Sequence, residues 1–195
     1  MSMVKSDVMK ISTAHYFYAE DENLEAPTMA DLGSISAIEA LGYTHVGYTS
    51  SENALETEAE GGEVSYDGPL QNTSLFTTIE SEIRSFTFNV WEWSSNNFRL
   101  AFGKNAVTRP DGSVGKHRFP QPMSGTWLVV FTTVEGYTYF HAPEADFIGT
   151  GDFGSVGGQN SYADMPIRVT PKFLDGADAA FYVLPLDKYR EGGTP

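Results

Sequence analysis

The stretch "SFTFNVWEW", residues 85–93, alternates between apolar and polar side chains over most of its length. Successive side chains of a β-strand point to opposite faces of a sheet. One face therefore carries Phe86, Phe88 and Val90, and the other carries Ser85, Thr87 and Asn89 before it becomes aromatic at Trp91 and Trp93. This pattern predicts a strand with one buried face. Its polar face must meet water, a ligand or another copy of the chain.

The rest of the chain has the composition of a mainly β protein. Glycine and proline interrupt it at short intervals, and β-branched and aromatic residues fill the segments between them. Candidate strands lie at 9–18, 43–50, 62–67, 83–92, 126–134, 137–142, 163–170 and 179–184. Glu135 and Gly136 predict a hairpin turn, in which glycine can adopt a positive φ. Pro166 lacks an amide hydrogen, so we expect its strand to be an edge strand or to contain a bulge.

Helix is scarce in this sequence. The segment "SSNNFRLAFG" offers a capping serine or asparagine, apolar residues for one face, and Gly103 as a stop. The segment "TMADLGSISAIEALG" favours one or two turns, since Gly33 opposes a longer helix. The connections at 104–124 and 149–162 are long, and the acidic stretch 51–72 is poorly apolar. We expect all three to leave the sheet, either as plain surface loops or as extensions toward neighbouring molecules.

Composition limits the classes of function. The chain has 195 residues, enough for one generous domain, and no cysteine, which excludes disulfides and thiolate metal sites. No apolar run reaches the length of a membrane span, and the start "MSMVKSDVMK" lacks the apolar core of a signal peptide, so we expect neither a membrane partner nor export by the usual route. The formal net charge of −14 opposes tight binding to the phosphates of nucleic acid.

The charge is unevenly distributed. Residues 1–92 carry 16 acids and 3 bases, whereas residues 93–195 carry 10 acids and 9 bases. An acidic block without any base contains Glu52, Glu56, Glu58, Glu60, Glu63 and Asp67. A basic block whose only acid is Asp111 contains Arg99, Lys104, Arg109, Lys116 and Arg118. Such blocks are either solvated or paired with each other, within one chain or between copies.

Motifs for catalysis or cofactor binding do not fit their required context. "GTGDFG" at 149–154 resembles a dinucleotide-binding loop, but the glycines that follow it prevent a helix from starting. His15, His45, His117 and His141 are scattered and form no metal-binding spacing. Asp146, Asp152 and Asp164 lack the regular spacing of a calcium loop. We therefore expect a non-enzymatic protein without a cofactor or a metal.

The chain resembles a known family from about Leu41 to Leu184. The stretch "LGYTHVGYTSSENALETEAEGGEVSYDGPLQNTSL" is similar to the major tail tube proteins of long, non-contractile-tailed bacteriophages, particularly those of actinobacterial hosts. "FTFNVWEWSSNNFRLAFG", "TWLVVFTTVEGYTYFHAPEADFI" and "SYADMPIRVTPKFLDGADAAFYVL" resemble that family's core strand and helix, central hairpin and closing strands. Two departures, the turn "GPLQN" and the loop 108–122, concern how rings stack.

The resemblance implies an antiparallel β-sandwich or partial barrel with one short flanking helix, in a single tail tube domain over residues 1–195. Residues 1–8 and 186–195 would form an extended N-terminal arm and C-terminal tail. Copies would form rings, commonly of six, that stack into a tube in the virion tail after assembly in the host cytoplasm. Their partners would be the same chain, other tail proteins, and double-stranded DNA in transit.

This interpretation assigns roles to the candidate residues. Ser85, Thr87 and Asn89 would line a water-filled bore, and Trp91 and Trp93 would pack on the short helix or on a neighbouring copy. The acidic block and the basic block would meet between adjacent rings. Two alternatives remain at this point, a tube protein of the type VI secretion kind and a carbohydrate-binding β-sandwich. The second would use Trp91, Trp93, Tyr137 and Tyr139 to stack on sugar rings.

Overall fold

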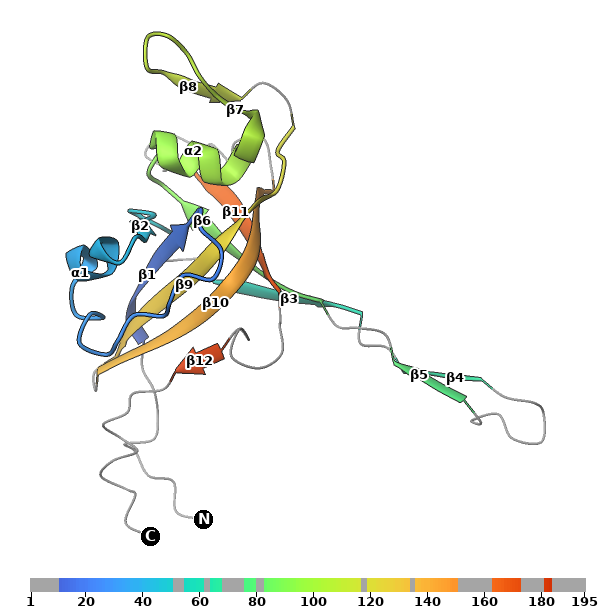
Figure 1. The fold of residues 1–195 in the computed structure, drawn as a ribbon. Coiled ribbons are helices and arrows are strands. Elements are labelled where there is room, and N and C mark those ends of the chain that lie inside the picture. Colours follow the sequence, from blue (N-terminus) through green and yellow to red (C-terminus); the bar gives the residue numbers. More distant parts are fainter. Residues whose placement is uncertain are drawn as a thin grey trace, which may run out of the picture.

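One eight-stranded antiparallel sheet dominates the computed structural model of the chain (Figure 1). The structure describes residues 11–50, 55–61, 64–67, 76–79, 83–116, 119–133, 136–150, 163–172 and 181–183. The strands follow the order β2 (Thr44–His45), β1 (Ile11–Ala19), β9 (Met123–Thr133), β10 (Gly136–Gly149), β11 (Met165–Pro171), β6 (Ile83–Val90) and β3 (Glu56–Glu60), and β12 (Phe181–Val183) also pairs with β10. The prediction of a mainly β, antiparallel fold is confirmed.

The sheet curls so that strands distant in its order face each other. The rings of Tyr16 on β1 and Phe88 on β6 stack with centroids 4.5 Å apart and planes 11° apart. At one end, segment 44–50 connects the two sides, because the amide of Val46 donates to Tyr16 and the amide of Ser50 donates to Asn89, each over 2.9 Å. The two layers expected of a sandwich therefore belong to one continuous, curled sheet.

The inside of this curl holds the main core. Phe86, Phe88 and Val90 are at most 3% exposed, as the alternation predicts. The ring of Phe86 lies 5.1 Å from that of Trp127 and 5.4 Å from that of Phe140, which joins β6 to β9 and β10 across the core. Full burial of each such side chain stabilises the fold by roughly 1.5–3 kcal/mol.

A second apolar cluster covers the outer face of β1, β9 and β10. Phe17, Leu128 and Val130 point to this side and pack under helix α1 (Ile35–Ala40), which buries Ile38. Since β1 and β9 are covered on both faces, their sequences lose the polar–apolar alternation of a half-buried strand. The N-cap Ser34 accepts a hydrogen bond from Ala37, and the helix is short, as expected from Gly33.

Helix α2 (Ser95–Phe102) closes one end of the curl, where it buries Leu100, Ala101 and Phe102. Its N-cap is Ser94, whose hydroxyl accepts from the amide of Asn97 over 3.2 Å. It ends at Gly103, which has a φ of +54° and whose hypothetical Cβ would lie 2.4 Å from the carbonyl oxygen of Gln121. Glycine is required there, and the predicted cap and stop are both confirmed.

Two small hairpins lie outside the main sheet. The 3-10 turn η2 (Gly103–Asn105) leads from α2 into β7 (Ala106–Thr108), which pairs with β8 (Val114–Lys116). The other hairpin pairs β4 (Val64–Asp67) with β5 (Phe76–Ile79) and projects far from the sheet (Figure 1). The long connection 104–124 and the stretch 51–72 thus contain strands. The sequence pattern indicated only β4 among these.

Two expectations about the sheet are wrong. Pro166 does not lie on an edge strand, since β11 is paired with β10 on one side and with β6 on the other. Its carbonyl faces β10, where it accepts from Thr150, and the register of β10 with β11 ends at Gly149 and Ile167. The missing amide hydrogen therefore falls where the pairing stops. Residues 56–60 also do not leave the sheet, because they form its strand β3.

Several predictions lie outside the described residues. They concern the N-terminal arm 1–8, the C-terminal tail 186–195, most of the loop 149–162, and the site residues Glu52, Glu63 and Arg118. Asp67 and Lys116 are described in their backbone only. Among the described residues, no helix combines the length and the apolar character needed to cross a bilayer.

Candidate functional site

Four neighbouring strands, β3, β6, β11 and β10, share one polar face on the outside of the curled sheet. Burial alternates strictly along β11, with Met165, Ile167, Val169 and Pro171 buried and the residues between them half-buried. Residues directly opposite in antiparallel strands lie on the same face of a sheet. Thr87 is opposite both Glu56 and Arg168, and Arg168 is in turn opposite Ile148. The predicted polar face of β6 is therefore the centre of a larger polar surface.

The three residues predicted to line a bore differ in exposure within the single chain. Thr87 and Asn89 are half-buried, and Ser85 is only 8% exposed. Ser85 is opposite Glu58 of β3, so the edge strand helps to cover it. All three lie on the polar face, away from the buried aromatic side chains of the same strand.

Strand β3 forms the edge of this surface. All five of its residues are exposed, and Glu56, Glu58 and Glu60 share the face of Thr87 and Ser85. Among the described residues, no strand pairs with its outer side. An exposed edge strand presents unpaired backbone groups to another chain, and charged side chains on it oppose indiscriminate pairing. The edge of β3 is therefore available for pairing with another strand, and its glutamates limit which strands can pair with it.

The polar face is acidic. Its described charged residues are Glu56, Glu58, Glu60, Glu144, Asp146, Arg168 and Lys172, that is, five acids and two bases, or −3. The charge of Lys172 is paired within this face, because its ammonium group binds the carboxylate of Glu144 and lies 3.4 Å from that of Asp146. These contacts raise the pKa of Lys172, the hydrogen bond to Glu144 most. Asp146 also accepts from the hydroxyl of Ser124 over 2.6 Å.

Sequence reasoning missed Arg168, Lys172 and Glu144 as members of this face. The alternation of "MPIRVTP" carries part of the signal, but only the strand order places β11 beside β6. The carboxylate of Asp146, considered above as a calcium ligand, forms an ion pair with Lys172 and accepts a hydrogen bond from Ser124. Within the described residues, acidic and histidine side chains form no group of three or more suited to a metal ion.

Trp91 and Trp93 follow β6 and hydrogen-bond to the segment that precedes β11. The indole nitrogen of Trp91 donates to the carboxylate of Asp164, and that of Trp93 donates to the carbonyl of Ala163 over 3.0 Å. The ring of Trp93 lies 6.1 Å from that of Phe98 on α2. For Trp93, one of the two expected packing partners, the helix, is therefore present within the chain.

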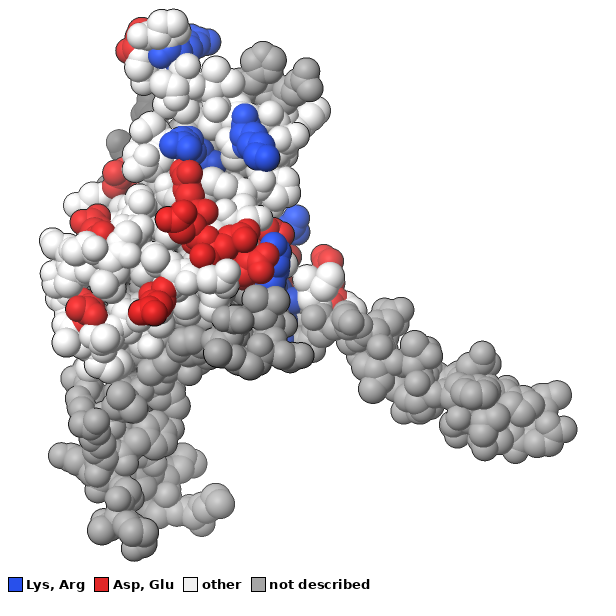
Figure 2. All heavy atoms as spheres, in the orientation of Figure 1, with Lys and Arg blue, Asp and Glu red and all other residues white. Residues whose placement is uncertain are grey.

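Three members of the basic block, Arg99, Lys104 and Arg109, lie at the end of the molecule that carries α2 and the β7–β8 hairpin. In the view of Figure 2, basic side chains lie at this end, and most of the acidic side chains lie below it. Arg99 makes an ion pair of 3.1 Å with Glu20 of the same chain. Glu20 does not belong to the acidic block, which is the partner that we expect for the basic block between rings. Both side chains are about half exposed, so this pair contributes at most about 1 kcal/mol. Lys104 and Arg109 are exposed.

A comparison with known families decides between the interpretations. The profile of one family, described as phage tail tube protein, matches residues 1–189 and so spans the sheet, both helices and the polar face. The chain belongs to the phage tail tube protein family. No curated protein matches it in a sequence search.

As a tail tube protein, the chain is a structural subunit of the virion tail, and the resemblance seen in the sequence is confirmed. The two alternatives are not favoured. The carbohydrate-binding interpretation also lacks its aromatic platform, because Tyr139 is only 7% exposed and belongs to the cluster under α1. Trp93 lies instead beside Phe98 of α2.

Proposed function

We propose that copies of this tail tube protein join side by side into closed rings of six, which stack into a tube through which double-stranded DNA passes. The polar face of β3, β6, β11 and β10 lines the bore in this arrangement. The observation that carries the proposal is the combination of that polar face with the open edge of β3. Closing copies into a circle removes the edge, as it does in any β-barrel.

Strand number supports a bore wide enough for a duplex. Porins with 16–18 strands already enclose an aqueous channel. If each of six copies contributes its strands β3, β6, β11 and β10 to the wall, about 24 strands surround the bore, more than in a porin. A single copy cannot form such a bore, so transport requires assembly. The ring order of six comes from the family resemblance.

The charge of the polar face suits passage without binding. DNA carries about one negative charge per 1.7 Å of its axis, and a basic wall would hold it at many points. The net −3 of the face in each copy repels the duplex instead. At physiological salt this repulsion acts over about 8 Å, which is enough to keep DNA from adhering to the wall. The role we propose is therefore a passive conduit without enzymatic activity, assembled in the host cytoplasm.

Electron cryomicroscopy of the purified protein tests this function. We expect rings or tubes in which Thr87 and Asn89 face the lumen and β3 contacts the neighbouring copy. Mass photometry over a concentration series provides an independent measure of ring size. Single molecules at every concentration, or tubes with the polar face on their outer surface, would contradict the proposal.

A further inference from the structure

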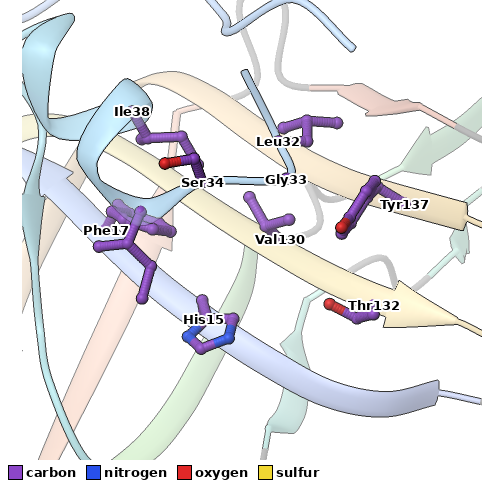
Figure 3. A pocket seen from close by; sticks show the side chains of 10 residues that line it. His15, Phe17, Leu32, Gly33, Ser34, Ile38, Val130, Thr132 and Tyr137 are labelled. Atoms are coloured by element: carbon purple, nitrogen blue, oxygen red, sulfur yellow. The ribbon is translucent and has the colours of Figure 1, made fainter. Parts of the chain in front are cut away.

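A pocket of about 350 Å³, lined by both apolar and polar side chains, opens on the outer side of the sheet, beside α1 (Figure 3). The buried side chains of Phe17, Val130 and Ile38 line its inner part. Ile35 is 38% exposed and Tyr137 is half-buried, so these two lie nearer to solvent. A pocket of this volume is at the small end of the range for ligand sites and accommodates one aromatic side chain.

Hydrogen bonds anchor the chain on either side, in sequence, of the lining residues Leu32 to Ile38. The hydroxyl of Tyr43 donates to the carbonyl of Glu25 over 2.9 Å, and the amide of Leu24 donates to the hydroxyl of Thr126 over 3.1 Å. The amide of Asn23 donates to the carbonyl of Pro143 over 2.9 Å. These bonds tie segment 23–25 to β9 and β10, and Tyr43, just before β2, to that segment. The chain is therefore anchored both before and after the lining residues Leu32 to Ile38.

Phe119 is an exposed aromatic side chain on the opposite, basic end of the molecule. It is 84% exposed, more than any other large apolar side chain in the part of the chain that the structure describes. Its backbone is nevertheless held, because the amide group of Asn105 donates to the carbonyl of Phe119 over 2.6 Å. Two residues later, the amide of Gln121 donates to Phe102 of α2. The backbone at Phe119 therefore has little conformational freedom to lose on binding, and its exposed ring is available for contact.

The surroundings of the pocket and of Phe119 carry opposite charge. Asp31 and Glu39 are adjacent in sequence to the lining residues Leu32 and Ile38, and residues 11–50 contain no lysine or arginine. Residues 99–119, which lead to Phe119, contain five bases and one acid. Oppositely charged surfaces attract each other at encounter and select one orientation.

We propose that Phe119 of one copy inserts into the pocket beside α1 of the next copy, with the basic end of the first against the acidic surroundings of the second. This contact rests on the proposed function, because it joins copies within the tube. It links two different parts of the surface, so each copy offers both a free Phe119 and a free pocket. Contacts of this head-to-tail kind continue from copy to copy, as an extended assembly requires.

Photocrosslinking tests which residues meet. Full-length protein with the photoreactive p-benzoylphenylalanine in place of Phe119 is assembled, irradiated and digested for mass spectrometry. We expect crosslinks between chains to peptides that contain Ile35, Ile38 or Val130. The same photoreactive residue in place of Tyr48, which is 79% exposed, provides the matched control and should not reach these peptides. Tubes that form normally but crosslink Phe119 elsewhere, or not at all, would overturn the contact.

Assembly measurements give a second, independent result. Phe119→Ala should raise the protein concentration for half-maximal assembly at least about tenfold, since a buried aromatic anchor commonly contributes that much to association. Tyr48→Ala should leave this concentration unchanged. Equal assembly of wild type and Phe119→Ala would overturn the contact while leaving the proposed function intact. Single molecules of wild-type protein at every concentration would instead overturn the proposed function and this contact together.

Discussion

His141 makes the stability of the fold depend on pH, and the size of this effect follows from its surroundings. The side chain is 2% exposed on β10, and its Nε2 atom lies 3.1 Å from both the hydroxyl of Tyr43 and the carbonyl of Leu24. Because the Tyr43 hydroxyl already donates its hydrogen to Glu25, Nε2 must carry the donated hydrogen. This geometry assigns the neutral tautomer that is protonated at Nε2.

Burial lowers the pKa of His141 from 6.5 to about 4, and the hydrogen bond to Leu24 opposes the shift only in part. The unfolded chain therefore takes up a proton as pH falls below about 6.5, while the folded chain stays neutral until about pH 4. Stability conferred by the neutral side chain is fully present above pH 6.5 and is lost as pH falls toward 4. A shift of about 2.5 pKa units corresponds to a loss of about 3 kcal/mol.

His141→Gln removes the titration and keeps an amide donor near the position of Nε2. We expect urea denaturation curves between pH 7 and pH 4 to show that wild type loses about 3 kcal/mol more stability than the variant. Carboxylates protonate in both proteins, so their effect cancels in the difference. His45→Gln serves as a comparison, since burial, and to a lesser degree the charge of His15, also lowers the pKa of His45. Parallel curves for wild type and His141→Gln, or an NMR titration of His141 near pH 6.5, would refute this reasoning.

Four further predictions concern the core, the helix and the assembled tube. Phe88→Ala should lower the free energy of unfolding by about 3–5 kcal/mol in urea denaturation, because it empties the space between β6 and Tyr16; a loss below about 1 kcal/mol would contradict the core described above. Ser94→Ala should cost about 1 kcal/mol through the lost N-cap, and Ser95→Ala, on an exposed residue, should cost much less. Simultaneous reversal of Glu56, Glu58 and Glu60 to lysine should change tube length and stability in electron micrographs; unchanged tubes would show that the acidic edge has no role in assembly. Thr87→Arg with Asn89→Arg should slow DNA release from particles in a salt-dependent way, and release at the wild-type rate would exclude these residues from the bore.

The local sequence pattern was sufficient to predict the orientation of a strand that has one buried and one polar face. The alternation of residues 85–90 predicted which side of β6 is buried, and the structure confirms it for Phe86, Phe88 and Val90. The cap at Ser94 and the stop at Gly103 were equally local and equally predictable. Each of these features depends on interactions within one turn or one strand, so the surrounding sequence contains the necessary information.

The sequence pattern did not predict the extent of strands whose formation depends on pairing with a neighbouring strand. Glutamate-rich residues 56–60 have little intrinsic preference for a strand, yet β6 offers them a complete row of backbone partners. The prediction for β10 ended at Ala142, before Pro143, whereas the structure continues to Gly149 through a register shift between Ala142 and Ala145. There the carbonyl of Pro143 accepts from Asn23. These outcomes depend on contacts between distant segments, which a pattern along the chain does not encode.

The candidate site shows the same division. Alternation placed Ser85, Thr87 and Asn89 on a polar face, but the charge of that face depends on Arg168, Lys172 and Glu144, which reach it only through the strand order. The basic block was recognised from composition, while the partner that Arg99 has within the chain, Glu20, lies outside the acidic block. Residue types along a segment were predictable, and their partners were not.

In the proposed tube, strand β3 would contribute both to the contact between copies and to the charge of the bore. Its glutamates lie on the polar face, and its outer backbone groups lie on the open edge of the same sheet. Three like charges on one edge oppose antiparallel pairing of β3 with β3 of another copy, a contact that would close a dimer and end growth. They leave pairing with a different edge as the favourable choice, which is the head-to-tail arrangement that a ring requires. The same three residues would then make the wall of the bore acidic, so neutralising them should increase wrong pairing and DNA adhesion together.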